Sequence, residues 1–258
     1  MIAWLAKAGK YQIEKLPCPN PGQPVDMRIP ATGVMHTTEG SFESALSVFR
    51  QHYAPNFLVG KDRNSKVRIV QLVPLGTMAA ALENPPGGVE TNRWARAQIE
   101  VVGFSKPVPW MFDPDTMDAV ACLMFALKDV ADIPLSRPFP ETMPALPWAT
   151  VSFPRRHADK WGKVGGWYGH VEVPENSHWD PGYLKWDSLL TAARAKQHPL
   201  PAPQPAPKPL PAQPEDDFIY LRDKDGQERW EPLTKSGAAL RSSQWLAGKY
   251  QELRFKRK

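Results

Sequence analysis

The chain has 258 residues, enough for one large domain or for a medium domain with a small appendage. Its hydrophobic content of 42% is that of a globular protein, and a net charge of +5 is too mild to select a particular anionic partner. The two cysteines, Cys18 and Cys122, imply no disulfide framework and lack metal-ligand spacing.

The first residues do not have the pattern of a signal peptide. MIAWLAKAGKYQIEK lacks the uninterrupted apolar core of about 7–15 residues that a signal peptide needs. No apolar run approaches the ~18 residues that cross a membrane. We therefore expect a chain that is made in the cytoplasm and has no membrane span, with residues 1–24 as an N-terminal extension.

Strand patterns recur through residues 25–197, which we predict to be the main domain. ATGVMH (31–36) and VRIVQLVPL (67–75) are typical of strands. AQIEVVGF (97–104) is apolar enough to be a central strand of a sheet.

Three helices are expected between and after these strands. SFESALSVFRQH (41–52) has Ser41 as a cap, DPDTMDAVACLMFALKDVA (113–131) has an Asp-Pro entry, and WDSLLTAARAK (186–196) follows later. In the first helix, four apolar residues share one face: Phe42, Ala45, Leu46 and Phe49. The pattern predicts an α/β domain with a mixed central β-sheet flanked by helices.

A proline-rich segment follows this domain. HPLPAPQPAPKPLPAQP (198–214) has proline at nearly every second position, which excludes helix and favours an extended linker. A docking site for a proline-binding module is the alternative.

Residues 215–258 form a small C-terminal module in this prediction. FIYLRD, a turn at Asp225-Gly226 and ERWEPLT precede a helix around GAALRSSQWLAGKY and a basic tail, RFKRK. Such a segment is either a small β-rich binding module or an appendage that needs the first domain for stability.

Histidine and aspartate residues form the candidate chemical site. His36 ends a predicted strand, and His170 follows the glycine-rich GKVGGWYG. HWDPG then supplies His178 and Asp180. Spacing alone leaves structural roles favoured over zinc binding for these residues.

The wording of three segments adds to that pattern. GVMHTTEG, QIEVVGF and GHVEVPENSHWDPG resemble, in order, the signature segments of type 2 N-acetylmuramoyl-L-alanine amidases, a superfamily that includes the peptidoglycan recognition proteins. The resemblance covers roughly residues 28–190, and its last segment is similar to endolysins of phages that infect actinobacteria. It implies a monomeric zinc amidase that acts on peptidoglycan and leaves the host cytoplasm through a holin pore.

The resemblance also implies a ligand set. The first two zinc ligands of the family fall on His36 and His170, and the third falls on Asp180. His178 is the alternative third ligand, because some relatives space theirs eight residues after the second histidine. Two imidazoles and one carboxylate leave a fourth tetrahedral position for water, as a catalytic zinc site requires.

Two further residues receive catalytic roles by the same resemblance. The acidic residue of the family falls on Glu100, expected as the general base that activates water, with a salt-bridged structural acid as the alternative. His178 stands where relatives often carry lysine, and it is expected to donate a hydrogen bond to the oxyanion.

Substrate contacts are expected from Asn56, Trp167 and Trp179. Asn56 stands where relatives commonly have a histidine. The tryptophans lie in an aromatic-rich stretch that either stacks on sugar faces or packs in a core. His52 is expected beside a helix C-terminus, and His157 either on the surface or against a substrate peptide.

Two other classes of function compete with a zinc amidase. The first is a peptidoglycan-binding recognition protein that has lost turnover, which retention of the four site residues disfavours. The second is nucleic-acid binding through RFKRK, which lacks a basic helix or an aromatic-basic platform. We expect no nucleic-acid partner.

Overall fold

The computed structural model describes residues 3–18, 22–105, 113–139, 158–182 and 184–196, and the backbone of 218–223, 228–232 and 250–255. The chain divides into two units, Met1–His198 and Pro199–Lys258. The predicted linker, 198–214, lies outside the described residues.

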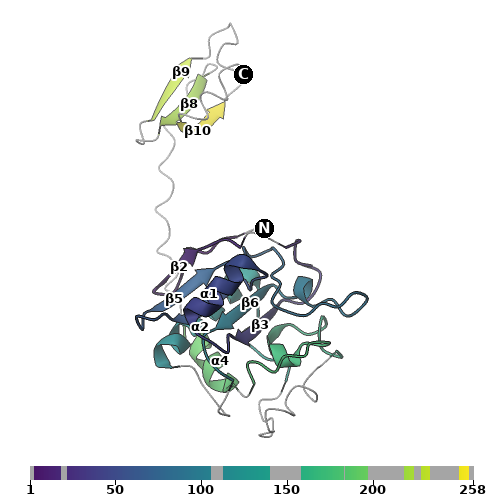
Figure 1. Ribbon diagram of the computed structural model, residues 1–258. Coiled ribbons are helices and arrows are strands. Elements are labelled where there is room, and N and C mark those ends of the chain that lie inside the picture. Colours follow the sequence, from purple (N-terminus) through teal and green to yellow (C-terminus); the bar gives the residue numbers. More distant parts are fainter. Residues whose placement is uncertain are drawn as a thin grey trace. The chain divides into compact units, whose positions relative to one another are not determined.

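The first unit contains a seven-stranded sheet in the order β1-β2-β5-β4-β6-β3-β7 (Figure 1). Four neighbouring pairs are parallel, while β1/β2 and β4/β5 are antiparallel, so the sheet is mixed as predicted. The strands are β1 (Lys7–Ala8), β2 (Tyr11–Lys15), β3 (Thr32–Thr37), β4 (Phe57–Lys61), β5 (Val67–Gln71), β6 (Ala97–Val101) and β7 (Gly166–Gly169).

Among the described residues, three α-helices accompany the sheet: α1 (Phe42–Gln51), α2 (Pro114–Ala131) and α4 (Trp186–Arg194). The predicted caps are confirmed. The Ser41 hydroxyl accepts a hydrogen bond from the Ser44 backbone N–H at 3.2 Å, and the Asp113 carboxylate caps α2 in the same way. Within the described residues, no helix has the length and apolarity needed to span a bilayer.

The helices lie in two layers on opposite faces of the sheet (Figure 1). Neighbouring side chains of a strand point to opposite faces, so Leu58 and Phe57 separate the two cores. Leu58 packs with Phe42 and Ala45 of α1. Phe57 belongs to the larger cluster, which contains buried residues of both α2 and α4, Leu123 and Leu189 among them.

The N-terminal residues contribute directly to this sheet. β2 pairs in parallel with β5, and β1 pairs with β2 at the edge. Residues 7–15, which fall within the expected N-terminal extension, therefore form part of the seven-stranded sheet.

The second unit contains three antiparallel strands in the order β10-β8-β9. β8 (Phe218–Asp223) covers FIYLRD, and β9 (Glu228–Pro232) lies in ERWEPLT. β10 (Tyr250–Phe255) covers residues for which we expected no strand. The turn at Asp225-Gly226 and most of the predicted helix lie outside the described residues.

A glycine in β3 allows the close approach of a large side chain. Gly33 pairs with Trp167 of β7, and a Cβ atom at position 33 would lie 2.7 Å from the Trp167 ring. Replacing Gly33 with alanine is expected to destabilise the protein by roughly 1–3 kcal/mol. The cost of this overpacking exceeds the stabilisation of roughly 0.5–1 kcal/mol that is otherwise expected when alanine replaces a glycine within a strand.

Urea denaturation of the Gly33→Ala protein measures the loss. Gly40→Ala is the matched control, because its Cβ would have no neighbour closer than 3.6 Å. A midpoint for Gly33→Ala equal to that of Gly40→Ala would contradict this account.

Candidate metal centre

His36 lies on β3, the strand next to the edge strand β7. It lies near the carboxyl end of β3, where every residue is buried, and its side chain is 1% exposed. On the neighbouring strand β6, Glu100 is paired with His36 and also with Leu58 of β4. Since paired residues project from the same face, His36 and Glu100 both lie on the α1 side of the sheet.

His170 directly follows β7, the edge strand beside β3. β7 runs parallel to β3 and ends at Gly169, so the chain delivers His170 next to the end of β3. The turn that follows, His170–Glu172, is held by the Glu172 carboxylate. This carboxylate accepts a hydrogen bond from the Gly169 N–H at 2.7 Å and forms a buried ion pair with Arg137.

Asp180 completes the group from a loop. The Asp180 backbone carbonyl accepts a hydrogen bond from the Val171 N–H at 2.8 Å. One carboxylate oxygen also accepts a hydrogen bond from the Thr37 backbone N–H at 3.2 Å. These contacts hold Asp180 against both the end of β3 and the turn that carries His170.

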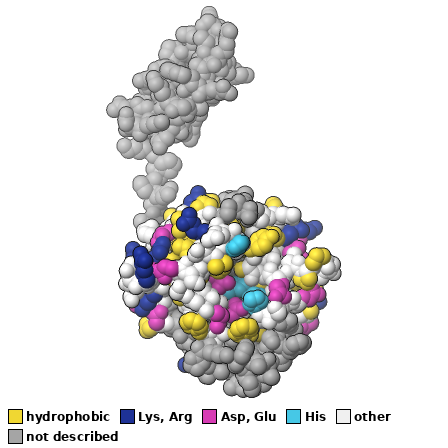
Figure 2. Space-filling model, in the orientation of Figure 1, with side chains coloured by type: hydrophobic (Ala, Val, Ile, Leu, Met, Phe, Trp, Pro, Cys, Tyr) yellow, Lys and Arg dark blue, Asp and Glu magenta, His cyan; other side chains and the backbone are white. Residues whose placement is uncertain are grey.

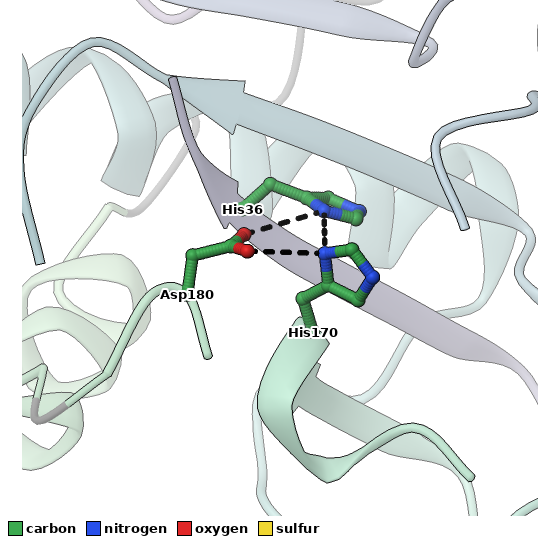
Figure 3. A group of neighbouring side chains, drawn as sticks. All are labelled: His36, His170 and Asp180. Atoms are coloured by element: carbon green, nitrogen blue, oxygen red, sulfur yellow. Dashed lines mark hydrogen bonds and ion pairs between the residues drawn. The ribbon is translucent and has the colours of Figure 1, made fainter. Parts of the chain in front are cut away.

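The three side chains converge as a buried group that could hold a metal ion (Figure 3). The Nδ1 atoms of His36 and His170 are 3.0 Å apart. The Asp180 carboxylate oxygens lie 3.5 Å from His36 Nδ1 and 3.2 Å from His170 Nδ1. Four donors at about 2.0 Å from a tetrahedral ion would be roughly 3.3 Å apart, so the spacing fits such an ion.

The protonation states of these residues also suit a metal ligand set. Burial, and then the neighbouring His170, lower the pKa of His36 to about 4, so its imidazole is neutral at pH 7. Burial opposes ionisation of Asp180, but its contacts with His170, His178 and His36 hold the pKa of the carboxyl well below its usual range. Metals are ligated by neutral imidazole and by ionised carboxylate.

Glu100 is a buried carboxylate beside this group. Among the described residues, its Oε2 atom has no hydrogen-bond partner. Burial, followed by the charges of Asp180 and Glu39, raises the pKa of Glu100 well above its usual range. An unpaired buried carboxylate is costly, and such groups are concentrated at functional sites. No described residue forms a salt bridge with Glu100, so the alternative of a structural acid finds no support in these contacts.

A cleft of about 360 Å³ is lined by two of the three ligand-type residues, His170 and Asp180, and by Glu100. Figure 2 shows histidine and acidic side chains gathered around a hollow in this face of the molecule. Part of the lining comes from α1 and part from the loop that carries Asp180. The lining residues are Thr37, Thr38, Glu39, Ser44, Ala45, Val48, Phe49, Ala81, Glu100, His170, His178, Trp179 and Asp180.

His178 lies at the mouth of this cleft, and 54% of its side chain is exposed. Its ring stacks on that of His170, with centroids 4.7 Å apart and planes inclined by 10°. Its Nδ1 atom lies 3.6 Å from Asp180 Oδ1. Because His178 is not part of the buried group, the structure brings it beside the candidate ligands without placing it among them.

The three expected substrate contacts have different environments. Trp179 lines the cleft, and its indole N–H donates a hydrogen bond to Ser105 Oγ at 2.9 Å. Asn56 and Trp167 are 0% exposed. The Asn56 amide bonds to the backbone of Gln98 and Val73, and Trp167 packs in the larger core. Neither side chain can contact a ligand in this structure.

The other aromatic residues of that stretch also pack in the interior. Trp161 and Tyr168 are buried in one cluster, with their rings edge-to-face at 5.1 Å between centroids. His52 follows α1, and its backbone N–H bonds to the Val48 carbonyl. His157 lies outside the described residues.

Asn176 is a site residue for which the sequence carried no signal. It lies in the loop between His170 and Asp180 and is 0% exposed. Its Oδ1 atom lies 2.8 Å from His170 Nε2. Asparagine before serine in a loop is usually a turn residue, so the motif alone does not identify this contact.

The sequence matches no protein-family model and no curated protein. Similar solved structures include a selenomethionine derivative of AmpD, at 17% identity and a TM-score of 0.44, covering 74% of this chain and 96% of that one. The N-acetylmuramoyl-L-alanine amidase LysC from Clostridium intestinale is also similar, at 12% identity and a TM-score of 0.41, covering 72% and 99%. The E90A mutant of PlyL has 12% identity and a TM-score of 0.40, covering 71% and 99%.

At these identities and TM-scores, the similar structures do not determine what this chain does, so its activity has to be argued from its own residues.

Proposed function

We propose that this chain is a zinc-dependent N-acetylmuramoyl-L-alanine amidase. It hydrolyses the amide that joins N-acetylmuramic acid to the L-alanine of the peptidoglycan stem peptide. The observation that carries the proposal is the buried group of His36, His170 and Asp180, of which His170 and Asp180 line a cleft together with Glu100. The identity of the cleaved bond comes from the resemblance to amidase signatures, which appears in order in GVMHTTEG, QIEVVGF and GHVEVPENSHWDPG.

The donor set favours zinc. Two imidazole nitrogens and one carboxylate oxygen are the ligands of many catalytic zinc sites, which keep a fourth position open. Hard cations such as magnesium and calcium prefer sites made of oxygen atoms alone. When bound, zinc polarises the scissile carbonyl and lowers the pKa of water to about 7.

Two residues of the chain then move or stabilise charge. Glu100 takes a proton from the attacking water and delivers it to the leaving amine as the carbon–nitrogen bond breaks. His178, at the mouth of the cleft, donates a hydrogen bond to the oxygen of the carbonyl as negative charge develops there. One water is consumed, and the products are the lactyl carboxylic acid and the free amino group of L-alanine.

The remaining parts of the chain fit a lytic enzyme that works at the cell wall. The three-stranded unit of residues 215–258 acts as a wall-binding module, and the linker of 198–214 tethers it to the catalytic domain, which raises the local concentration of enzyme. The similarity of HVEVPENSHWDPG to phage endolysins supports a role in host lysis. A monomeric enzyme would then remain in the host cytoplasm until a holin pore opens.

Removal of the metal tests this proposal. We expect the purified full chain to contain about one zinc per molecule and to release dye from labelled cell walls. Chelation is expected to reduce the release to background, and added zinc is expected to restore it. Mass spectrometry of the products should show free L-alanine amino termini and intact glycan strands.

Other outcomes would identify other functions. Dye release that is indifferent to the chelator would overturn the zinc mechanism. Cleaved glycosidic bonds would overturn the assigned bond. Binding to walls without any release would favour a recognition protein that has lost turnover.

A further inference from the structure

Asn176 contacts the outer nitrogen of the second candidate ligand. His170 directs Nδ1 toward His36 and Asp180, and its Nε2 atom lies 2.8 Å from Asn176 Oδ1. Both side chains are buried, His170 at 3% exposure and Asn176 at 0%. Water therefore does not replace this contact easily, and Asn176 is the hydrogen-bond partner of His170 Nε2.

The orientation of the Asn176 amide is determined by the backbone around it. Its Oδ1 atom accepts a second hydrogen bond from the Glu83 N–H, at 2.8 Å. Its Nδ2 atom donates to the Pro174 carbonyl at 3.0 Å and faces the Glu83 carbonyl at 3.4 Å. A flipped amide would place N–H groups against the Glu83 N–H and oxygen against two carbonyls, so Oδ1 must be the atom that faces His170.

This orientation has a consequence for the histidine. An amide oxygen is only an acceptor, so His170 Nε2 must carry the proton of the neutral imidazole. The lone pair is then on Nδ1, which is the atom directed at His36 and Asp180. The hydrogen bond at one ring nitrogen sets the metal-binding state of the other.

We infer that Asn176 is a positioning residue that holds His170 in the tautomer able to bind a metal through Nδ1. It also joins that histidine to the backbone of Glu83, in the loop that follows β5. The inference deepens the proposed function and rests on it only for the identity of the ion.

A second buried asparagine gives a matched comparison. Asn92 is 5% exposed and bonds to the backbone of Leu82 through both amide atoms, at 3.1 and 2.8 Å. It also accepts a hydrogen bond from Gln98, but no histidine contacts it in the described residues. Asn92 thus anchors the same loop as Asn176 without touching the candidate metal ligands.

Zinc affinity of variants in the full chain tests the inference. By competition with a chromogenic chelator, we expect Asn176→Leu to bind zinc about 10–100-fold more weakly than the natural protein. Asn92→Leu loses a similar set of buried hydrogen bonds and is expected to retain full zinc affinity. Equal zinc affinity of Asn176→Leu and Asn92→Leu would overturn the inference.

A measurement on the unaltered protein keeps the test independent of folding in the variants. In ¹⁵N NMR spectra of the metal-free chain, we expect His170 Nε2 to carry a proton, because Asn176 Oδ1 can only accept a hydrogen bond. An unprotonated Nε2 would overturn the positioning role. If the unaltered chain binds no zinc, the proposed function fails, and the NMR result still decides whether Asn176 sets the tautomer.

Discussion

Replacing Asp180 with alanine is expected to abolish zinc binding and to reduce hydrolysis of peptidoglycan to background. The change removes one of three donors from a buried group, and it leaves His36 and His170 only 3.0 Å apart with no carboxylate to balance a cation. Zinc content after dialysis and dye release from cell walls measure the two effects.

His178→Ala is the matched comparison for this variant. His178 is two residues away, half exposed and outside the buried group, so its removal should leave zinc bound. Loss of one oxyanion donor is expected to reduce turnover about 10²–10³-fold. If His178→Ala lost zinc while Asp180→Ala retained it, His178 would be the third ligand.

Glu100→Gln is expected to keep zinc and to reduce turnover about 10²–10⁴-fold. Glutamine has nearly the shape of glutamate, but it cannot take a proton from water at neutral pH. Glu100 lines the cleft beside the candidate ligands, and one of its oxygens meets no partner among the described residues. Zinc content and steady-state kinetics with soluble peptidoglycan fragments separate binding of the metal from turnover.

Glu39→Gln provides the control. Glu39 also lines the cleft, but its Oε1 atom accepts hydrogen bonds from Thr37 Oγ1 at 2.9 Å and from the Ser105 N–H at 2.8 Å. A glutamine can accept the same two bonds, so we expect less than about a tenfold loss of turnover. The reverse ranking of the two variants would identify Glu39, and not Glu100, as the base.

The helices could be predicted because their signals are local. In α1, Ser41 caps the first turn, and the four apolar residues at helical spacing all pack against one side of the sheet. The Asp-Pro entry of α2 gives the same kind of signal. The interior position of β6 could be predicted because AQIEVVGF is apolar enough for a strand covered on both faces, although it contains Gln98 and Glu100.

The edges of the sheet could not be predicted in the same way. β1 is two residues long, and β7 is the sequence GWYG, which reads as a glycine-rich loop. These residues become strands only because β2 and β3 offer them a partner. The burial of Trp167 depends on the same pairing, since its ring needs the absence of a side chain at Gly33.

The candidate site also contains parts that could be predicted from the sequence and parts that could not. The resemblance assigns His36 and Glu100 to one site, and the structure places them on one face because they are paired between parallel strands. The loop from His170 to Asp180 has no such regularity, so the contact of Asn176 with His170 and the stacking of His178 had to come from the structure.

The position of β7 has a consequence for folding. The candidate ligands come from residue 36 and from residues 170–180, so they meet only after the last strand of the sheet has paired with β3. An ion that binds this assembled group and not the unfolded chain would stabilise the fold by about 2.7 kcal/mol at a concentration 100 times its Kd. The bound ion would also stabilise the pairing of the edge strand β7 with β3 and suppress the local opening to which sheet edges are prone.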